Sequence, residues 1–145
     1  MVEKLREGGA VTFSPKGTSM LPMLRSGLDS VTLKKPPAKL KRGTVALFIS
    51  SGSEERKYIL HRLVRIKNGE YTFCGDNRLT ADSPVPYENV LGVVTEFVRK
   101  GKKRSIRSFI YGLYSFYMVS TVGIRRFTLR LERSVYRIWK RIRGR

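Results

Sequence analysis

The amino-acid sequence predicts a mainly-β fold class: coiled antiparallel sheets over residues 1–98, followed by two amphipathic helices in a basic tail over residues 99–145. Three observations support this. Short apolar and β-branched runs of strand length alternate with turn-forming residues up to residue 98. Asn68-Gly69 stands between two such runs, which is the strongest short-range signal of a hairpin. After residue 105, apolar residues recur every three or four positions, as in a helix.

Four segments are expected to be strands besides the hairpin. Val11–Phe13 is a short strand that enters a turn at Gly17, and residues 29–33 alternate polar and apolar side chains, as a half-buried strand does. Residues 44–49 are apolar and β-branched, and they lie between Gly43 and Ser50-Ser51-Gly52, so we expect them to form a core strand. Residues 90–98 form the last expected strand.

The hairpin joins residues 58–66 to residues 71–74. A two-residue loop at Asn68-Gly69 fixes the register, which sets Lys67 opposite Glu70. If the same register continues, His61 lies opposite Asp76, and opposed residues project to the same face of a sheet. Pairing alone therefore predicts that Asp76 approaches the histidine. Residues 76–86 are expected to form a loop.

The tail begins with residues 100–104, a basic stretch that suggests a linker. Two helices joined near Gly123 are predicted by the spacing of two apolar sets: Ile106, Phe109, Ile110, Leu113, Tyr114 and Tyr117, and then Ile124, Phe127, Leu131, Val135, Ile138 and Ile142. In the second helix, arginine and lysine fill most of the remaining positions.

The positive charge of the chain is concentrated in this tail. Residues 1–98 hold 15 Lys/Arg and 10 Asp/Glu, a net charge of +5, whereas residues 99–145 hold 15 Lys/Arg and one acid, a net charge of +14. Such a tail suits an anionic membrane surface, a nucleic acid or an acidic protein. We favour the membrane surface, bound through residues 106–145, because no RNA-binding motif or recognition helix stands out.

The mode of membrane association is left open by the sequence. Residues 108–124 carry no charge over 17 positions, which is short for a spanning helix, since about 20 apolar residues are typical. The expected localisation is therefore membrane-associated, either peripheral on the cytoplasmic face or through a single C-terminal span.

Ser19 and His61 are the residues with the clearest chemical potential. A serine hydroxyl is a weak nucleophile unless a base takes its proton, and His61 is the only histidine. Asp76 and Asp82 follow in one turn-rich stretch and are candidate acids for orienting that base. Cys74 is the only cysteine, which excludes an intrachain disulfide and a cysteine-based metal site, and we expect neither a metal nor a cofactor.

Several segments, in order, resemble the type I signal peptidase and SOS-repressor-type serine peptidase superfamily. Residues 17–22, Gly-Thr-Ser-Met-Leu-Pro, followed by Gly27-Leu28-Asp29-Ser30-Val31, resemble its G-x-S-M-x-P…G-D-x-V signature. Residues 41–46, residues 60–64 and the series Gly75-Asp76-Asn77, Asp82 and 90–94 resemble its later motifs. With histidine rather than lysine at position 61, the chain resembles the branch of archaeal, endoplasmic-reticulum and sporulation-type signal peptidases.

The resemblance implies roles for individual residues. Ser19 would be the nucleophile, His61 the general base and Asp82 its orienting acid, with Asp76 as a supporting acid. The turn at Gly17 and Thr18 would aim backbone N–H groups at the oxyanion, each worth roughly 3–4 kcal/mol. The family often has a serine donor two residues before the nucleophile, where this chain has Gly17, and Leu28 lengthens the Gly-Asp turn by one residue.

The sequence therefore predicts a serine endopeptidase similar to signal peptidases, which cleaves a leader or signal peptide by a Ser-His-Asp mechanism. Two alternatives stay open. One is a cytoplasmic self-processing or regulatory peptidase of the repressor type, which would cut at a bond such as Gly9-Ala10. The other is a non-catalytic module that binds peptide or nucleic acid on a degenerate peptidase scaffold.

Overall fold

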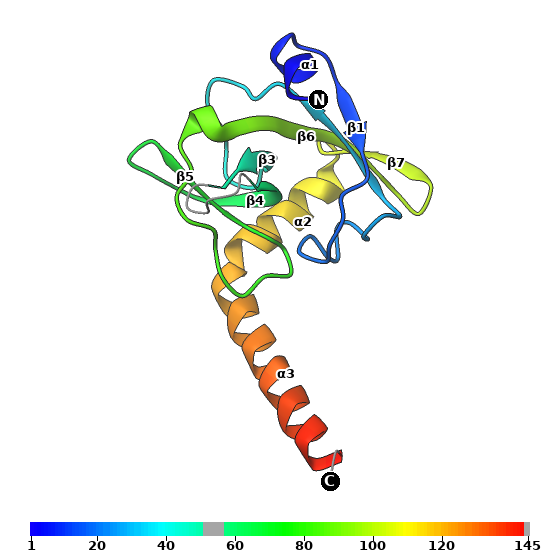
Figure 1. Ribbon diagram of the computed structural model, residues 1–145, viewed down its shortest axis with the longest axis vertical. Helices are drawn as coiled ribbons and strands as arrows, with labels where there is room; N and C mark the ends of the chain where they lie inside the picture. The colour runs from blue at the N-terminus through cyan, green and yellow to red at the C-terminus, as the bar shows by residue number, and fades with distance from the viewer. Residues whose placement is uncertain (51–56, 144–145) are drawn as a thin grey trace.

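The computed structural model describes residues 1–50 and 57–143, which form a mainly-β domain with two C-terminal helices (Figure 1). Seven antiparallel strands of the described residues make one sheet in the order β1-β2-β6-β3-β4-β5, with β7 paired to β6. The strands are β1 Val11–Phe13, β2 Ser30–Lys34, β3 Val45–Ile49, β4 Tyr58–Lys67, β5 Glu70–Cys74, β6 Val90–Arg99 and β7 Lys102–Ser105. The helices are α1 Val2–Arg6, the 3-10 turn η1 Tyr87–Asn89, α2 Phe109–Ser120 and α3 Val122–Arg143.

The predicted strands of residues 1–98 are confirmed, with ends that differ by one residue. The central strand β3 explains why residues 44–49 are a continuous apolar run. Val45 and Leu47 belong to one buried cluster, and Ala46 and Phe48 belong to another on the opposite face. A strand that is buried on both faces has no reason to alternate. The Ser51-Gly52 part of the turn predicted after this strand lies outside the described residues.

The hairpin of β4 and β5 follows the predicted register only near its turn. Lys67 pairs with Glu70 as predicted, but a β-bulge between Leu63 and Arg65 shifts the register by one residue. Beyond the bulge Leu63 pairs with Phe73, and Arg62 pairs with Cys74. A one-residue shift exchanges the faces of a strand, so the predicted pairing of His61 with Asp76 is wrong.

The sequence suggested a linker at residues 100–104, but this segment forms a turn and a strand of the sheet. Lys100 and Gly101 turn the chain with positive φ angles of 51° and 73°, and β7 pairs back onto β6. The sheet therefore extends through residue 105, beyond the predicted boundary at residue 98.

The two tail helices differ in how they meet the sheet. Helix α2 lies against the sheet, whereas α3 extends away from the body of the molecule (Figure 1). The residues of α2 that pack inward include Tyr111, Tyr114 and Met118, while Phe109, Ile110 and Leu113 of the predicted apolar face are exposed. The prediction that α2 is amphipathic is wrong, because this helix has no charged residue and is apolar on both sides.

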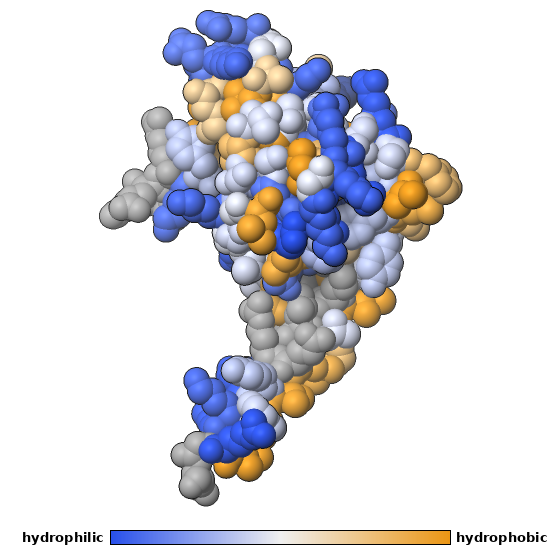
Figure 2. Space-filling model, turned by 90° about the vertical axis from the view of Figure 1, so that its right-hand side faces the viewer, coloured by the Kyte–Doolittle hydropathy of each residue, from blue (hydrophilic) through white to orange (hydrophobic). Residues whose placement is uncertain are grey.

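Helix α3 has the predicted amphipathic pattern. Its apolar residues form one exposed stripe, visible along one edge of the tail in Figure 2. The exposed apolar residues at the predicted spacing are Ile124, Phe127, Leu131, Val135, Ile138 and Ile142. Within residues 1–50 and 57–143, we find no helix with both the length and the apolar character needed to cross a membrane.

Candidate active site

His61 and Asp82 form a hydrogen-bonded pair at one face of the sheet. Strand β4 carries His61, which is only 2% exposed, and its Nδ1 lies 2.6 Å from Asp82 Oδ2. Because a carboxylate only accepts, Nδ1 is assigned as the protonated nitrogen, which leaves the Nε2 lone pair available to accept a proton. This is the arrangement of a general base held by an acid.

The backbone of the loop after β5 positions Asp82. Its N–H donates to Phe73 O at 2.8 Å, and three residues later Val85 pairs with Tyr71 in both directions, at 2.8 and 2.9 Å. Residues 76–86, predicted as a loop, are thus tied along β5. These main-chain bonds hold Asp82 beside β5, the strand next to β4, which carries His61.

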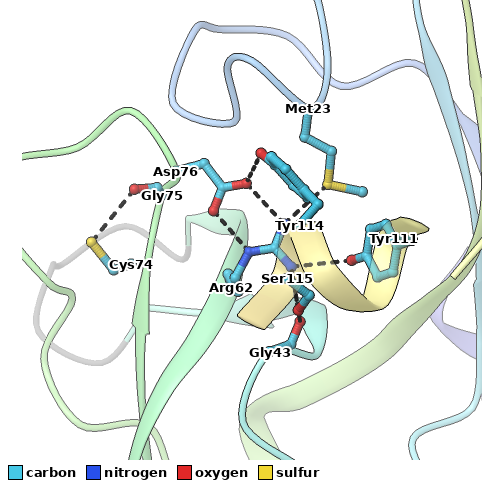
Figure 3. Close-up of polar contacts among 9 residues, drawn as sticks. All are labelled: Met23, Gly43, Arg62, Cys74, Gly75, Asp76, Tyr111, Tyr114 and Ser115. Carbon is cyan, nitrogen blue, oxygen red and sulfur yellow. Dashed lines mark hydrogen bonds and ion pairs between the residues drawn. The ribbon is translucent and has the colours of Figure 1, made fainter. Parts of the chain in front are cut away.

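Asp76 pairs with Arg62 instead of with His61, as Figure 3 shows. Two hydrogen bonds of 2.8 Å join the carboxylate to Arg62 Nε and Nη2. Both side chains are buried, and Arg62 is completely inaccessible. Neighbouring residues of a strand point to opposite faces, so His61 and Arg62 each receive one acid on their own side of the sheet.

Helix α2 closes over this buried pair (Figure 3). Tyr114 donates to Asp76 Oδ2 at 2.9 Å, and Arg62 Nη1 donates to Tyr111 and Ser115 at 3.1 and 3.0 Å. Arg62 also reaches Gly43 O at 3.0 Å and Met23 Sδ at 3.3 Å. Asp76 is therefore part of a structural network that includes residues of α2, far outside the sequence motif.

The pKa values of Arg62, Tyr111 and Tyr114 in this network are shifted from their ordinary values. Burial would lower the pKa of Arg62, but the hydrogen bonds and charge of Asp76 more than offset this, so the pKa is raised. Burial raises the pKa of Tyr111 and of Tyr114. The charge of Asp76 raises the pKa of Tyr114 further. Both phenols therefore remain neutral donors or acceptors at neutral pH.

Ser19 lies against the turn that follows β5. Asn77 N donates to Ser19 O at 2.8 Å, and the Asn77 side chain donates to Thr18 O at 3.3 Å. A Cβ added to Gly75 would lie 2.7 Å from Ser19 O and 2.9 Å from His61 Nε2. The backbone of Ser19 and the Nε2 edge of the imidazole thus meet at Gly75, where only glycine fits.

One groove of about 440 Å³ contains both Ser19 and His61. Its walls also include Leu60, Ser26 and the basic residues Lys16, Arg25 and Arg78. Among the described residues, Ser19 and His61 share this groove without a direct hydrogen bond between them. Such bonds are often long before a substrate is bound. The groove is roomy enough for a peptide segment.

The turn before Ser19 differs from the prediction in its donors. Gly17 has a φ of +95°, a conformation that favours glycine, but its N–H donates to Ser26 Oγ at 2.9 Å. The Gly17 N–H is therefore engaged and does not face an oxyanion. Thr18 is exposed beside it. Sequence reasoning missed Ser26, and the chain offers no motif that would have singled it out.

Asp29 has a structural role in this region. It is buried, accepts three hydrogen bonds from Arg25 at 2.7–3.1 Å and accepts a fourth from Lys100 N at 3.2 Å. These hydrogen bonds, first of all those from the Arg25 side chain, hold its pKa well below the usual range. Leu28, the additional residue of the Gly-Asp turn, is 73% exposed, so it bulges outward and leaves Asp29 in place.

Cys74 is buried and its thiol donates weakly to Gly75 O and Thr80 O at 3.5 and 3.6 Å. Over the part of the chain that the structure describes, no three His, Cys, Asp or Glu side chains gather as metal ligands do.

Comparisons of the chain with family models, curated proteins and solved structures found no match.

Proposed function

We propose that this protein is a serine endopeptidase similar to signal peptidases, with Ser19 as nucleophile, His61 as general base and Asp82 as orienting acid. The observation that supports this best is a buried imidazole whose Nδ1 is held by Asp82 at 2.6 Å, in the groove that contains Ser19. A buried histidine with one nitrogen fixed by an acid and the other facing a groove is prepared to accept a proton.

The chemistry proposed is acyl transfer. Ser19 Oγ attacks a peptide carbonyl as His61 Nε2 takes the hydroxyl proton, and that proton then goes to the leaving amine. Water attacks the acyl-serine in a second step and restores the hydroxyl. Asp82 keeps the proton on Nδ1 and favours the imidazolium. The resemblance to signal peptidases suggests a leader peptide with small side chains before the cut.

Ser26 is the groove residue best suited to assist the oxyanion. Its Oγ accepts from Gly17 N, so its own hydroxyl hydrogen is free to donate, and it lines the groove with Ser19. We include it in the proposal as a replacement for the serine donor that the family has at the position of Gly17. Thr18 remains a second candidate, because it is exposed at the same turn.

The test compares wild-type protein with Ser19→Ala and with a matched control, Ser14→Ala, which changes an exposed serine of the same segment. Each is incubated with leader-bearing peptides in detergent, and the products are identified by mass spectrometry. We expect cleavage by the wild type and by Ser14→Ala, and none by Ser19→Ala. Cleavage by all three, or by none over a wide panel of leaders, contradicts the proposal.

The self-processing alternative has no observation in its favour. Gly9 N donates to Lys4 O at 2.8 Å, and neither Gly9 nor Ala10 lines the groove of Ser19 and His61. For a non-catalytic module, we likewise find no feature that requires it.

We further propose that the protein associates peripherally with an anionic membrane surface through α3. Its apolar stripe is exposed, and basic residues at positions such as Arg137, Lys140 and Arg141 are exposed as well. A helix with one apolar edge and one basic edge binds in the plane of a membrane interface.

The membrane proposal is tested with sedimented anionic vesicles. Replacing Leu131 and Ile138 by Gln removes apolar area from the stripe without a change of charge and should lower the bound fraction several-fold. The control replaces Leu28 and Ile66, two exposed apolar residues away from the tail, by Gln. Recovery of the wild type in the supernatant would end this proposal.

A further inference from the structure

A second hollow, separate from the groove of Ser19, lies between the β6–β7 hairpin and the start of α2. Its volume is about 430 Å³, within the range of small-molecule sites. Its floor is apolar and aromatic, and its rim is basic. The floor includes Met23, Phe97, Ile110, Tyr111 and Tyr114, and the rim includes Arg99, Lys100, Lys102 and Arg104.

The pairing of β6 with β7 explains why the cations gather on this side. Phe97 lies opposite Arg104, and Arg99 lies opposite Lys102. Opposed residues share a face and alternate residues return to it, so all four project to one face of the hairpin. The next residues along the hairpin belong to the other face, where Lys103 pairs with Glu96 at 2.8 Å.

The cations of the rim are not neutralised by the described part of the chain. No ion pair joins Arg99, Lys102 or Arg104 to a carboxylate among the described residues. Asp29, the nearest acid to this turn, is occupied by Arg25 and by Lys100 N. Like charges that face each other across two strands destabilise the pair, so Arg99 opposite Lys102 costs stability without a visible compensation.

The start of α2 adds to the positive potential beside an apolar surface. Ser108 caps the helix by accepting from Tyr111 N at 3.2 Å, and the first turn has no acid. The amino end of a helix carries a partial positive charge. At the same place, Phe109 and Ile110 are 79% and 72% exposed. The hollow therefore presents cations and uncovered apolar side chains together.

We propose that this hollow binds an anionic phospholipid, with the phosphate between Arg99, Lys102 and Arg104 and the apolar part of the lipid on Ile110 and Tyr111. A free phosphate satisfies the rim but not the floor, and an uncharged lipid satisfies the floor but not the rim. A phosphate ester that carries an apolar chain satisfies both. This site is distinct from the stripe of α3, and its occupation does not depend on the peptidase proposal.

The hollow also contacts the buried pair of Arg62 and Asp76. Tyr111 and Tyr114 line the hollow, and their hydroxyls contact Arg62 and Asp76. A lipid seated on these rings holds α2 against the buried pair. Binding to the folded state alone raises its stability in proportion to the logarithm of ligand concentration.

The probe is a short-chain phosphatidylglycerol kept below its micelle concentration, titrated calorimetrically into the full chain, so that no bilayer is present for α3. We expect saturable binding and a rise in melting temperature. Phosphatidylcholine of the same chain length, glycerol phosphate and inorganic phosphate should each bind at least about tenfold more weakly. If either phosphate alone binds as tightly as the lipid, the apolar floor has no part and the proposal is overturned.

The variant Arg99→Gln/Lys102→Gln should weaken lipid binding by at least about tenfold and should fold normally, because it removes a like-charge pair. The matched control is Arg65→Gln/Lys67→Gln, which removes the same charge from exposed positions of the β4–β5 hairpin. Ile110→Gln should weaken binding of the lipid but not of phosphate. Equal affinities of the two charge variants, or no binding of the lipid to the wild type, would overturn the site, whereas Ser19→Ala should bind as the wild type does.

Discussion

His61 and Arg62 are adjacent in sequence, and each is paired with its own acid. His61 faces the groove with Asp82, and Arg62 faces α2 with Asp76. The first pair borders the groove that contains Ser19, and the second is covered by Tyr111 and Tyr114. Two pairs of similar composition therefore differ in their surroundings, because one borders a groove and the other is enclosed.

Replacing each acid by asparagine should separate the effects of the two pairs on activity and on stability. Asp82→Asn keeps the shape of the loop but no longer fixes the proton on His61 Nδ1, so we expect cleavage of a leader peptide to fall by about 10²–10⁴-fold with little loss of stability. Asp76→Asn is the comparison, since it leaves Arg62 buried without a counter-charge and should cost about 3–5 kcal/mol in the free energy of unfolding. Rates by mass spectrometry and urea unfolding measure the two effects. A stable, fully active Asp82→Asn protein would exclude the role of Asp82.

Asp29 should make stability depend on pH in the acid range. Folding lowers the pKa of Asp29 below its ordinary value of 3.8. The contribution of its carboxylate to the free energy of unfolding is therefore present above pH 3.8 and is lost as the pH falls below that value toward the lowered pKa. Asp29→Asn should be less stable than the wild type by roughly 1–3 kcal/mol at pH 7, and the gap should narrow from about pH 5 to pH 2. Urea unfolding at several pH values measures this, with Glu88→Gln, at an exposed site, as control. A gap that stays constant down to pH 2 would show that Asp29 does not stabilise through its charge.

At the level of the elements, the strands could be predicted because their signals are local. The alternation in β2, the apolar run of β3 and the Asn68-Gly69 turn depend on burial and turn geometry. The bulge at Val64 could not be predicted, since it arises from how the whole hairpin packs on both faces. Because of this bulge, Asp76 pairs with Arg62 instead of with His61. His61 pairs with Asp82, the acid that the family resemblance had implied.

Helix α2 shows a case in which the element was predicted correctly but its amphipathic character was not. The spacing of residues such as Phe109, Ile110 and Leu113 predicted an amphipathic helix, but the helix is apolar all round and these three residues are exposed. Among the side chains that pack inward, Tyr111, Tyr114 and Ser115 also offer hydroxyls to Arg62 and Asp76. The face of α2 that packs inward is the one that contacts the buried pair of Arg62 and Asp76, which spacing alone does not reveal.

The turn between β5 and Asp82 should be sensitive to a single methyl group. In Gly75→Ala the new Cβ would approach Ser19 O to 2.7 Å, so the backbone of the turn or of Ser19 must move. Because misplacement by about 1 Å costs roughly 10²-fold in rate, we expect cleavage to fall by that order. Gly112→Ala is the control, since a Cβ there meets nothing within 4 Å and alanine favours a helix. Equal activity of the two variants would show that the site tolerates movement at Gly75.

For the whole molecule, the sheet and its packing extend past the point at which charge divides the chain into domain and tail. A division after residue 98 was predicted from charge, yet β7 extends the sheet and α2 supplies three residues to the network around Arg62. The position at which the chain leaves the body is between α2 and α3, at Thr121.

Truncation should show this boundary. A chain that ends after Thr121 keeps all of α2, and we expect its urea midpoint to match that of the full chain, because the apolar side chains of the α3 stripe are exposed. A chain that ends after Ser105 loses Tyr111 and Tyr114 and should unfold at distinctly lower urea concentration, if it folds at all. Circular dichroism during unfolding measures both. Equal midpoints for the two truncations would mean that α2 is not part of the domain.

The closure of α2 over Arg62 also sets an order of events during synthesis. A ribosome makes the chain from its amino end, so the residues that carry Ser19, His61 and Asp82 emerge before Tyr111 and Ser115. Until α2 has formed, water reaches the Arg62 guanidinium, and the turn that hydrogen-bonds to Ser19 has no support from α2. Under the proposed peptidase function, a nascent chain would therefore become able to cleave peptides only after these groups have left the ribosome.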